Sequence, residues 1–353
     1  MHFNVPYIYS SEELKEYFIG VYKSTEARSP TVEPGVERLR RLELTRIRKA
    51  GKSLIDALRD MATSMPFVAD LHPFYRDLLD LGVGIPRYKH ALAKIGNATS
   101  AVRAISKEAT IALRTAYTKD QIYRVRKAFI ARIIDLIDDL APELEIIKSA
   151  SSFFKKLPDI DPELFTIVVS GAPNVGKSSL VGCLSTAKPE VAEYPFTTKQ
   201  IHVGHIFVKG DKIQVIDTPG LLDRPFEEMN NIEKQAVLAL RHLAKVILFV
   251  VDPTHHSGYD PYIQINIYNS IKKNFNVPII IVLNKIDIAN KEEIRKIEGL
   301  FGIDLMRISA ILCTGIEELK NKILEDYYVP YMLNKLVDER KRVNAESRRQ
   351  LPI

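Results

Sequence analysis

The stretch LFTIVVSGAPNVGKSSLVGCL, residues 164–184, decides the fold of the second half of this chain. It opens with a short β-branched run, continues with GAPNVGKS, which fits G-x-x-x-x-G-K-[ST], and ends in a helical pattern. The glycines let the backbone curl so that successive N–H groups point inward, toward an anion. Strand, loop and helix together predict a phosphate-binding loop at the start of an α/β domain.

From residue 164 onward, short β-branched runs alternate with helical stretches. We expect strands at 164–169, 201–208, 212–216, 245–251, 278–283 and 304–308. Gly210 and Asp211 join the second and third strands, which predicts an antiparallel hairpin. The other strands are each followed by a loop and a helix, which is typical of a parallel sheet. The sequence therefore predicts an α/β P-loop domain with a mainly parallel six-stranded sheet and one antiparallel strand. Its ligand is expected beyond the carboxyl ends of the strands.

Three further motifs each follow a predicted strand. DTPG at 217–220 places a carboxylate within reach of Mg²⁺ and a glycine N–H within reach of a γ-phosphate. In NKID at 284–287, the carboxylate of Asp287 can accept hydrogen bonds from the N1–H and 2-amino groups of guanine, which adenine does not offer. Backbone N–H groups at Ser309 and Ala310 can meet the guanine oxygen. Each motif alone is compatible with an ordinary turn, but the four in this order predict a GTP/GDP site and disfavour an ATPase.

The motifs resemble those of the TRAFAC-class GTPases, and within that class the Obg-related branch, over residues 164–330. The stretch IDTPGLLDRPFEEMNNIEKQAVLALRHL, residues 216–243, is similar to the NOG-type nucleolar GTP-binding proteins. Archaeal relatives of these proteins carry a helical N-terminal domain of about the size found here. The resemblance implies a GTP-hydrolysing enzyme that takes part in maturation of the large ribosomal subunit, with its helical domain against rRNA.

The resemblance also implies roles for single residues. PFTT at 195–198 implies that Thr198 is the switch threonine on Mg²⁺ and the γ-phosphate. The expected catalytic residues are Lys177, Thr198 and Gly220, and the expected Mg²⁺ ligands are Ser178, Thr198 and Asp217. The expected nucleotide-binding residues are Gly171, Ala172, Pro173, Asn174, Val175, Gly176, Lys177, Ser178, Ser179, Thr197, Thr198, Asp217, Gly220, Asn284, Lys285, Asp287, Ser309 and Ala310.

Two positions bear on the rate of hydrolysis. In Ras-like enzymes a glutamine after the DxxG glycine orients the attacking water, whereas this chain has Leu221 there. A leucine cannot hydrogen-bond to water, so we expect slow turnover by the isolated protein, on the order of 10⁻³ s⁻¹ or below, and stimulation by a partner particle. In several related GTPases an asparagine at the position of Asn174 helps to hold K⁺; the alternative is that Asn174 only shapes the loop.

The first half of the chain has helical periodicity and an excess of positive charge. Residues 35–132 hold 20 Lys or Arg and 9 Asp or Glu, although the net charge of the whole chain is only +6. An apolar stripe runs through residues 34–65, and a basic line on another face consists of Arg41, Arg48, Lys52 and Arg59. We expect this line to bind RNA phosphates. The alternatives are a solvated helix face, or a nucleotide-gated switch that binds an anionic membrane surface or an acidic protein.

The remaining helical half sets the expected domain boundaries. Residues 122–140 predict a second amphipathic helix, Gly82 to Pro86 a break, and Asn97 to Ser100 the caps of a helix over 99–117. KKLPDIDPE at 155–163 predicts a hinge. We therefore expect an N-terminal all-α helical bundle at 1–160, the GTPase domain at 161–330 and a basic C-terminal tail at 331–353.

Composition narrows the class of protein. The chain of 353 residues has 46% hydrophobic and 27% charged residues, a composition typical of a folded protein rather than a disordered one. None of its apolar runs is as long as the roughly 20 residues that a membrane span needs. Its start does not have the pattern of a signal peptide. Two cysteines favour a reducing cytosol, so we expect buried free thiols at Cys183 and Cys313 and a cytoplasmic protein.

Overall fold

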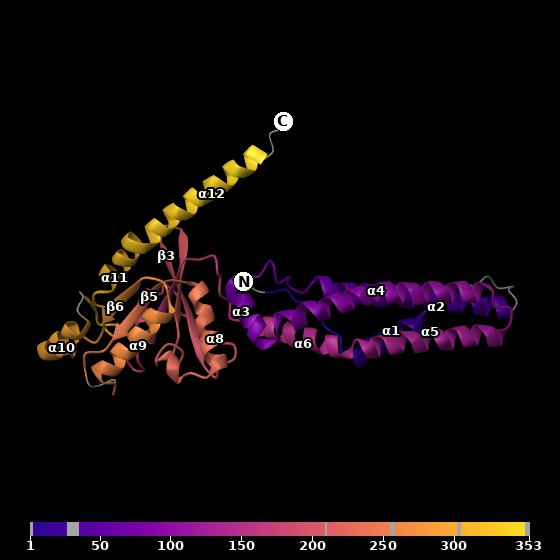
Figure 1. Cartoon of the computed structure of the whole chain (residues 1–353), viewed down its shortest axis with the longest axis horizontal. Helices are drawn as coiled ribbons and strands as arrows, with labels where there is room; N and C mark the ends of the chain where they lie inside the picture. Colours follow the sequence, from indigo (N-terminus) through magenta and orange to yellow (C-terminus); the bar gives the residue numbers. More distant parts are fainter. Residues whose placement is uncertain (1–2, 27–34, 209, 255–257, 302–304, 350–353) are drawn as a thin grey trace. The chain divides into compact units, whose positions relative to one another are not determined.

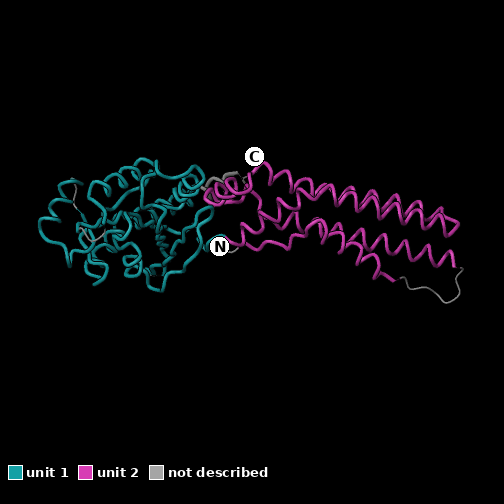
Figure 2. The backbone as a smooth tube through the Cα atoms, turned by 90° about the horizontal axis from the view of Figure 1, so that it is seen from below, with its two compact units in different colours: residues 1, 157–353 teal, residues 2–156 magenta. Residues whose placement is uncertain are grey.

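A computed structural model describes residues 3–26, 35–208, 210–254, 258–301 and 305–349. The chain divides after Lys156 into two compact units, residues 2–156 and residues 157–353 (Figure 2). Each unit has its own buried core. No helix in the described ranges combines the length and the apolar character needed to cross a membrane.

The described part of the first unit is built from helices and their connections. These helices are α1 (Ser11–Ser24), α2 (Gly35–Thr63), α3 (Pro73–Gly82), α4 (Ile85–Arg114), α5 (Lys119–Asp139) and α6 (Ala141–Lys156). α2 and α4 lie side by side, while α1 packs on α2 and α5, and α4 also contacts α5 and α6 (Figure 1). The apolar stripe of residues 34–65 faces this core, since Ile47, Leu54 and Leu58 are fully buried. The predicted all-α N-terminal domain is therefore confirmed.

Helix α4 begins earlier than the sequence predicted. We expected Asn97 to Ser100 to cap a new helix, but α4 continues through these residues. It starts after Gly84 with Pro86 in its first turn, where the missing N–H of a proline has no intrahelical partner to lose. The Thr99 hydroxyl donates to the carbonyl of Gly96 at 2.7 Å, so this polar side chain is satisfied inside the helix.

α2 and α4 approach each other closely at small residues. A Cβ at Gly51 would lie 2.4 Å from Oγ of Ser106, and one at Gly96 would lie 3.8 Å from Cβ of Ala62. Residue numbers rise along α2 as they fall along α4, so the two helices are antiparallel. A larger residue at Gly51 would force the helices apart or displace Ser106.

The second unit contains a seven-stranded sheet with the order β2-β3-β4-β1-β5-β6-β7. The strands are β1 (Thr166–Ser170), β2 (Glu190–Glu193), β3 (Gln200–Val208), β4 (Asp211–Asp217), β5 (Ala244–Val251), β6 (Ile279–Leu283) and β7 (Met306–Arg307). β3 is antiparallel to both of its neighbours, and the other pairs are parallel. The predicted α/β P-loop fold is confirmed, but the sheet has seven strands rather than six. The additional strand, β2, is a mostly exposed edge strand with the sequence EVAE, so it has no apolar run to reveal it.

Helices cover the sheet, and the strand order indicates the edge at which a ligand can bind. They are α7 (Lys177–Leu184), α8 (Asn231–Ala239), α9 (Pro261–Asn274), α10 (Lys291–Phe301) and α11 (Ile316–Ile323). α7 contacts β1, β3, β4 and α11, whereas α9 contacts α10. The chain extends the sheet from β1 to one side through β4 and then crosses to β5 on the other side. The strand order thus reverses at β1, which is where open α/β sheets bind ligands.

The last part of the chain is helical where it is described. The residues expected as a tail belong mostly to α12 (Val329–Arg349), which follows a π-helical turn at Leu324–Tyr328 (Figure 1). Residues 350–353 of the expected tail lie outside the described residues. A basic sequence of this kind gave no decision between a helix and an irregular tail.

The expectation of two buried free thiols is wrong. Cys183 in α7 and Cys313 in the loop before α11 form a disulfide with their Cα atoms 5.8 Å apart. Cys183 is half-buried and Cys313 is exposed. The two residues are 130 positions apart in sequence, so only the packing of the α/β unit brings them together. The argument for a reducing cytosol that rested on free cysteines is thereby lost.

Candidate nucleotide site and basic groove

Two glycines of the phosphate-binding loop occupy positions that no other residue could take without displacement. Gly171 has a φ of +139°, and Gly176 has a φ of +96°. A Cβ at Gly171 would lie 2.3 Å from the carbonyl oxygen of Val250, and one at Gly176 would lie 2.3 Å from Nδ2 of Asn284. The loop therefore fits closely between the end of β5 and the NKID loop.

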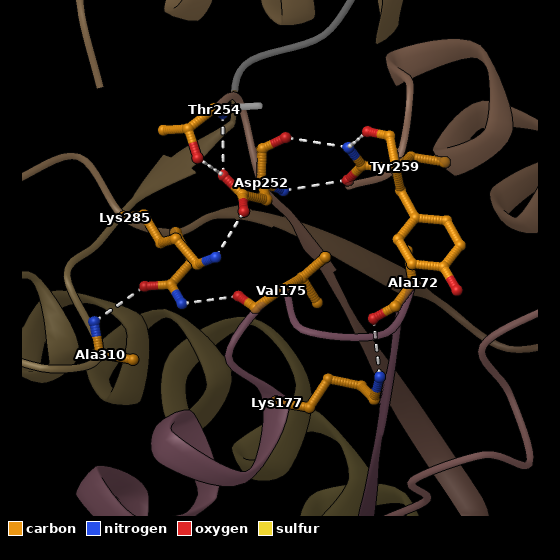
Figure 3. A network of polar contacts seen from close by, with 10 residues as sticks. Ala172, Val175, Lys177, Asp252, Thr254, Tyr259, Lys285 and Ala310 are labelled. Carbon is orange, nitrogen blue, oxygen red and sulfur yellow. Dashed lines mark hydrogen bonds and ion pairs between the residues drawn. The ribbon is translucent and has the colours of Figure 1, made fainter. Parts of the chain in front are cut away.

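Lys177 is held inside the phosphate-binding loop. Its side chain is only 6% exposed, and Nζ donates to the carbonyls of Gly171 at 2.9 Å and Ala172 at 2.8 Å. Figure 3 shows the hydrogen bond to Ala172. Burial lowers the pKa of Lys177, and the negative charges of Asp223 and Asp217 offset this shift only in part. A phosphate in this loop would supply the opposite charge that a buried ammonium group needs.

Ser178 and Asp217 form a corner with the chemistry of a hard-cation site. Oγ of Ser178 donates to Oδ2 of Asp217 at 2.6 Å, and Nδ1 of His202 lies 3.2 Å from the same oxygen. Asp217 is fully buried, and its Oδ1 has no hydrogen-bond partner in the part of the chain that the structure describes. Leaving a buried carboxylate oxygen unpaired is costly, and a bound cation would remove that cost.

Eight of the residues expected at the phosphates line one open pocket of about 790 Å³, whereas Gly171, Ala172, Val175, Thr197 and Asp217 are not part of its lining. Its lining consists of Pro173, Asn174, Gly176, Lys177, Ser178, Ser179, Thr198, Lys199, Gln200, His202, Pro219, Gly220 and Asp223. Thr198 is exposed in this pocket, whereas the Thr197 hydroxyl donates to the carbonyl of Tyr194 at 3.0 Å. Sequence reasoning missed five of these pocket residues, which are Lys199, Gln200, His202, Pro219 and Asp223. Their only signal was proximity to the TT and DTPG motifs.

At the guanine end, one side chain connects three of the motifs. Asn284 is 2% exposed; its Nδ2 donates to the carbonyl of Val175 at 2.8 Å, and its Oδ1 accepts from the N–H of Ala310 at 2.8 Å (Figure 3). The phosphate-binding loop, the NKID loop and the loop after β7 are therefore held together before any ligand contributes. This arrangement fixes the spacing between the phosphate end and the base end of the site.

In the rest of the NKID loop, Lys285 forms an internal ion pair and Asp287 is exposed to solvent. Lys285 has a φ of +61°, and its Nζ lies 2.6 Å from Oδ2 of the fully buried Asp252 (Figure 3). Sequence reasoning missed Asp252, although it directly follows a predicted strand. Ser309 is buried, whereas Asp287 is exposed and free to meet a base from solvent.

In the helical unit, a groove between α2 and α4 collects positive side chains. Its lining residues are Arg48, Gly51, Lys52, Ile55, Asp56, Arg59, Arg103, Ser106, Lys107, Thr110, Ile111 and Arg114. Three of the four expected RNA-binding residues line it, but Arg41 does not, and its guanidinium lies 3.8 Å from Glu37. Sequence reasoning missed the three cations of α4. They have the same spacing as those of α2, with gaps of four and seven residues.

Comparison with known proteins identifies relatives of both units. The 50S ribosome-binding GTPase family matches residues 166–285, and the NOG1 N-terminal helical domain matches residues 11–161. Nucleolar GTP-binding protein 1 of Saccharomyces cerevisiae is 32% identical over 92% of this chain and 52% of its own length. An uncharacterized protein of Methanocaldococcus jannaschii is 37% identical over 74% of this chain and 73% of its own.

A solved structure, a putative nucleolar GTP-binding protein 1 from Plasmodium falciparum, is 37% identical with a TM-score of 0.44. The match covers 54% of this chain and all of that one. The chain spans about half the length of the curated nucleolar relatives it matches.

Proposed function

This chain belongs to the family of NOG1-type GTP-binding proteins, and on that premise we propose that it is a GTP-hydrolysing assembly factor of the large ribosomal subunit. The observation that supports GTP most directly is the bridge made by Asn284 between the phosphate-binding loop and Ala310. The bridge leaves the Asp287 carboxylate exposed, where it can accept hydrogen bonds from guanine. The helical unit would contact rRNA through its basic groove.

We further propose that Ser178, Asp217 and Thr198 hold Mg²⁺. The unpartnered Oδ1 of Asp217 and the adjacent Ser178 hydroxyl are oxygen ligands of the kind that Mg²⁺ prefers. Bound Mg²⁺ would neutralise charge on the β- and γ-phosphates. Asn174 lines the same pocket, which supports a K⁺ ligand at this position as a second, separate proposal.

Hydrolysis itself depends on charge and positioning rather than on a covalent intermediate. The ammonium group of Lys177 would place a positive charge beside the phosphates, and the Gly220 N–H would donate a hydrogen bond to the γ-phosphate. Leu221 is fully buried, so it neither reaches nor orients water. We therefore propose that hydrolysis is slow until a ribosomal particle supplies or orders the missing group.

RNA binding by the groove is supported by the length over which its charges are spread. Because α2 and α4 are antiparallel, the six cations cover about 16 helical positions, or about 24 Å at 1.5 Å per residue. Asp56 is the one acidic residue in the lining. Such a line of charge suits several successive phosphates of one strand and is independent of base sequence.

Co-sedimentation tests this function and separates it from binding to an anionic membrane. The full chain with GDP or a non-hydrolysable GTP analogue is centrifuged with large ribosomal subunits or with vesicles containing phosphatidylserine, at about 50 and 200 mM salt. The variant Lys52→Glu/Lys107→Glu should lose most subunit binding, and Lys127→Glu, an exposed cation of α5 outside the groove, should retain it. Vesicle binding without subunit binding would favour the membrane alternative, and binding that both variants retain would contradict the groove.

GTP use is tested separately by the affinities for GTP and ATP and by the release of phosphate. The cytoplasmic location expected from the sequence stays a prediction, since the curated relatives are named for the nucleolus.

A further inference from the structure

The side chain of Lys199 lies against Gly220, the glycine that directly precedes Leu221. Gly220 has a φ of +75°, and a Cβ built on it would lie 2.7 to 2.9 Å from Cδ, Cε and Nζ of Lys199. The end of this side chain therefore rests on the glycine that would bind the γ-phosphate. Lys199 also directly follows the switch residue Thr198, and both line the phosphate pocket.

The two lysines of this pocket have different environments. Lys177 is buried and hydrogen-bonded to the carbonyls of the phosphate-binding loop. Lys199 is exposed, and among the residues that the structure describes no carboxylate forms an ion pair with it. Its ammonium group is therefore available for a ligand on the Gly220 side of the pocket. The carboxylate of Asp223 lines the same pocket.

We propose that Lys199 is a catalytic residue for GTP hydrolysis, which places a positive charge on the γ-phosphoryl oxygens in the transition state. In this step the water oxygen forms a bond to the γ-phosphorus while the bond from that phosphorus to the β–γ bridging oxygen breaks. The electron pair stays on GDP, and the water protons pass to the phosphate product and solvent. A fixed positive group near the γ-phosphoryl oxygens stabilises the charge they carry, which is the role an arginine finger has in other GTPases.

The proposal rests on the GTPase function proposed above, so the test measures binding and chemistry separately. Lys199→Met should lower the single-turnover rate at saturating GTP by about 10- to 100-fold, less than a fully enclosed arginine finger contributes because Lys199 is exposed. Its affinity for GDP, measured with a fluorescent analogue, should change by less than about twofold, because GDP has no γ-phosphate. Lys199→Arg should keep most of the rate.

Lys212→Met is the matched control. Lys212 is exposed and is the second residue of β4, at the end of this strand away from the pocket. This variant should leave both rate and affinity unchanged. A single-turnover rate of Lys199→Met within twofold of the unsubstituted protein would overturn the proposal. So would a loss of rate that a higher GTP concentration restores, because the lysine would then contribute only to ground-state binding. Failure of the unsubstituted protein to bind GTP would instead refute the proposed function.

Discussion

Reduction of the Cys183–Cys313 disulfide should destabilise the GTPase unit by about 2 to 4 kcal/mol. The bond joins residues 130 positions apart, and the chain-entropy relation for a loop of that length gives about 5 kcal/mol at 25 °C as an upper value. The measured loss should be smaller, because an unfolded chain with residual structure loses less entropy on cross-linking. For a domain of about 200 residues this corresponds to a lower Tm by about 5 to 15 °C.

Calorimetry of the full chain with and without dithiothreitol measures this effect. The chain has two units, so the transition of the GTPase unit is identified as the one that GDP moves upward. The variant Cys183→Ser/Cys313→Ser should melt like the reduced protein and should not respond to dithiothreitol. A titration of free thiols establishes that the oxidised sample has none. Equal melting temperatures for the oxidised protein, the reduced protein and the variant would refute the reasoning.

Three further predictions concern single residues. Asp287→Asn should weaken GTP binding by at least about tenfold and improve binding of xanthosine triphosphate, because an amide can donate to the second oxygen of xanthine; unchanged GTP affinity would contradict the guanine assignment. GTP turnover should be faster in K⁺ than in Na⁺ at equal ionic strength, and Asn174→Ala should remove the difference; equal rates in the two salts would indicate that Asn174 only shapes its loop. The N–H of Ser10 holds the pKa of Glu13 at about 2, with help from the Tyr7 hydroxyl. Because the pKa of Glu13 is lowered in the folded state, its ionised carboxylate stabilises that state above pH 4.5. This stabilisation is lost as the pH falls from 4.5 toward 2. Acid titration followed by circular dichroism should therefore show this loss of stability in the unsubstituted protein and not in Glu13→Gln.

The sequence alone determined the local elements of this protein. The phosphate-binding loop was predictable because its glycines, lysine and serine are adjacent in the chain and their conformation is set by neighbouring backbone. The buried strands were predictable because strands that are covered on both faces have continuous apolar, β-branched sequences. The apolar stripe on α2 was predictable because burial of one helix face imposes a period on the sequence. Even the wrong start of α4 came from a local rule, since cap residues are tolerated inside a helix when their side chains find a carbonyl.

Tertiary structure decided which distant residues meet. The disulfide, the contact of Lys199 with Gly220, and the alignment of α4 cations beside those of α2 each join positions whose separation in sequence is set by the fold topology. A residue pattern reports on the face of its own helix or strand, but not on the element that will pack against that face. The chain's sequence therefore predicted a nucleotide site and a basic helix, whereas the tertiary structure of each unit was needed to show a groove with two basic walls and a lysine against Gly220.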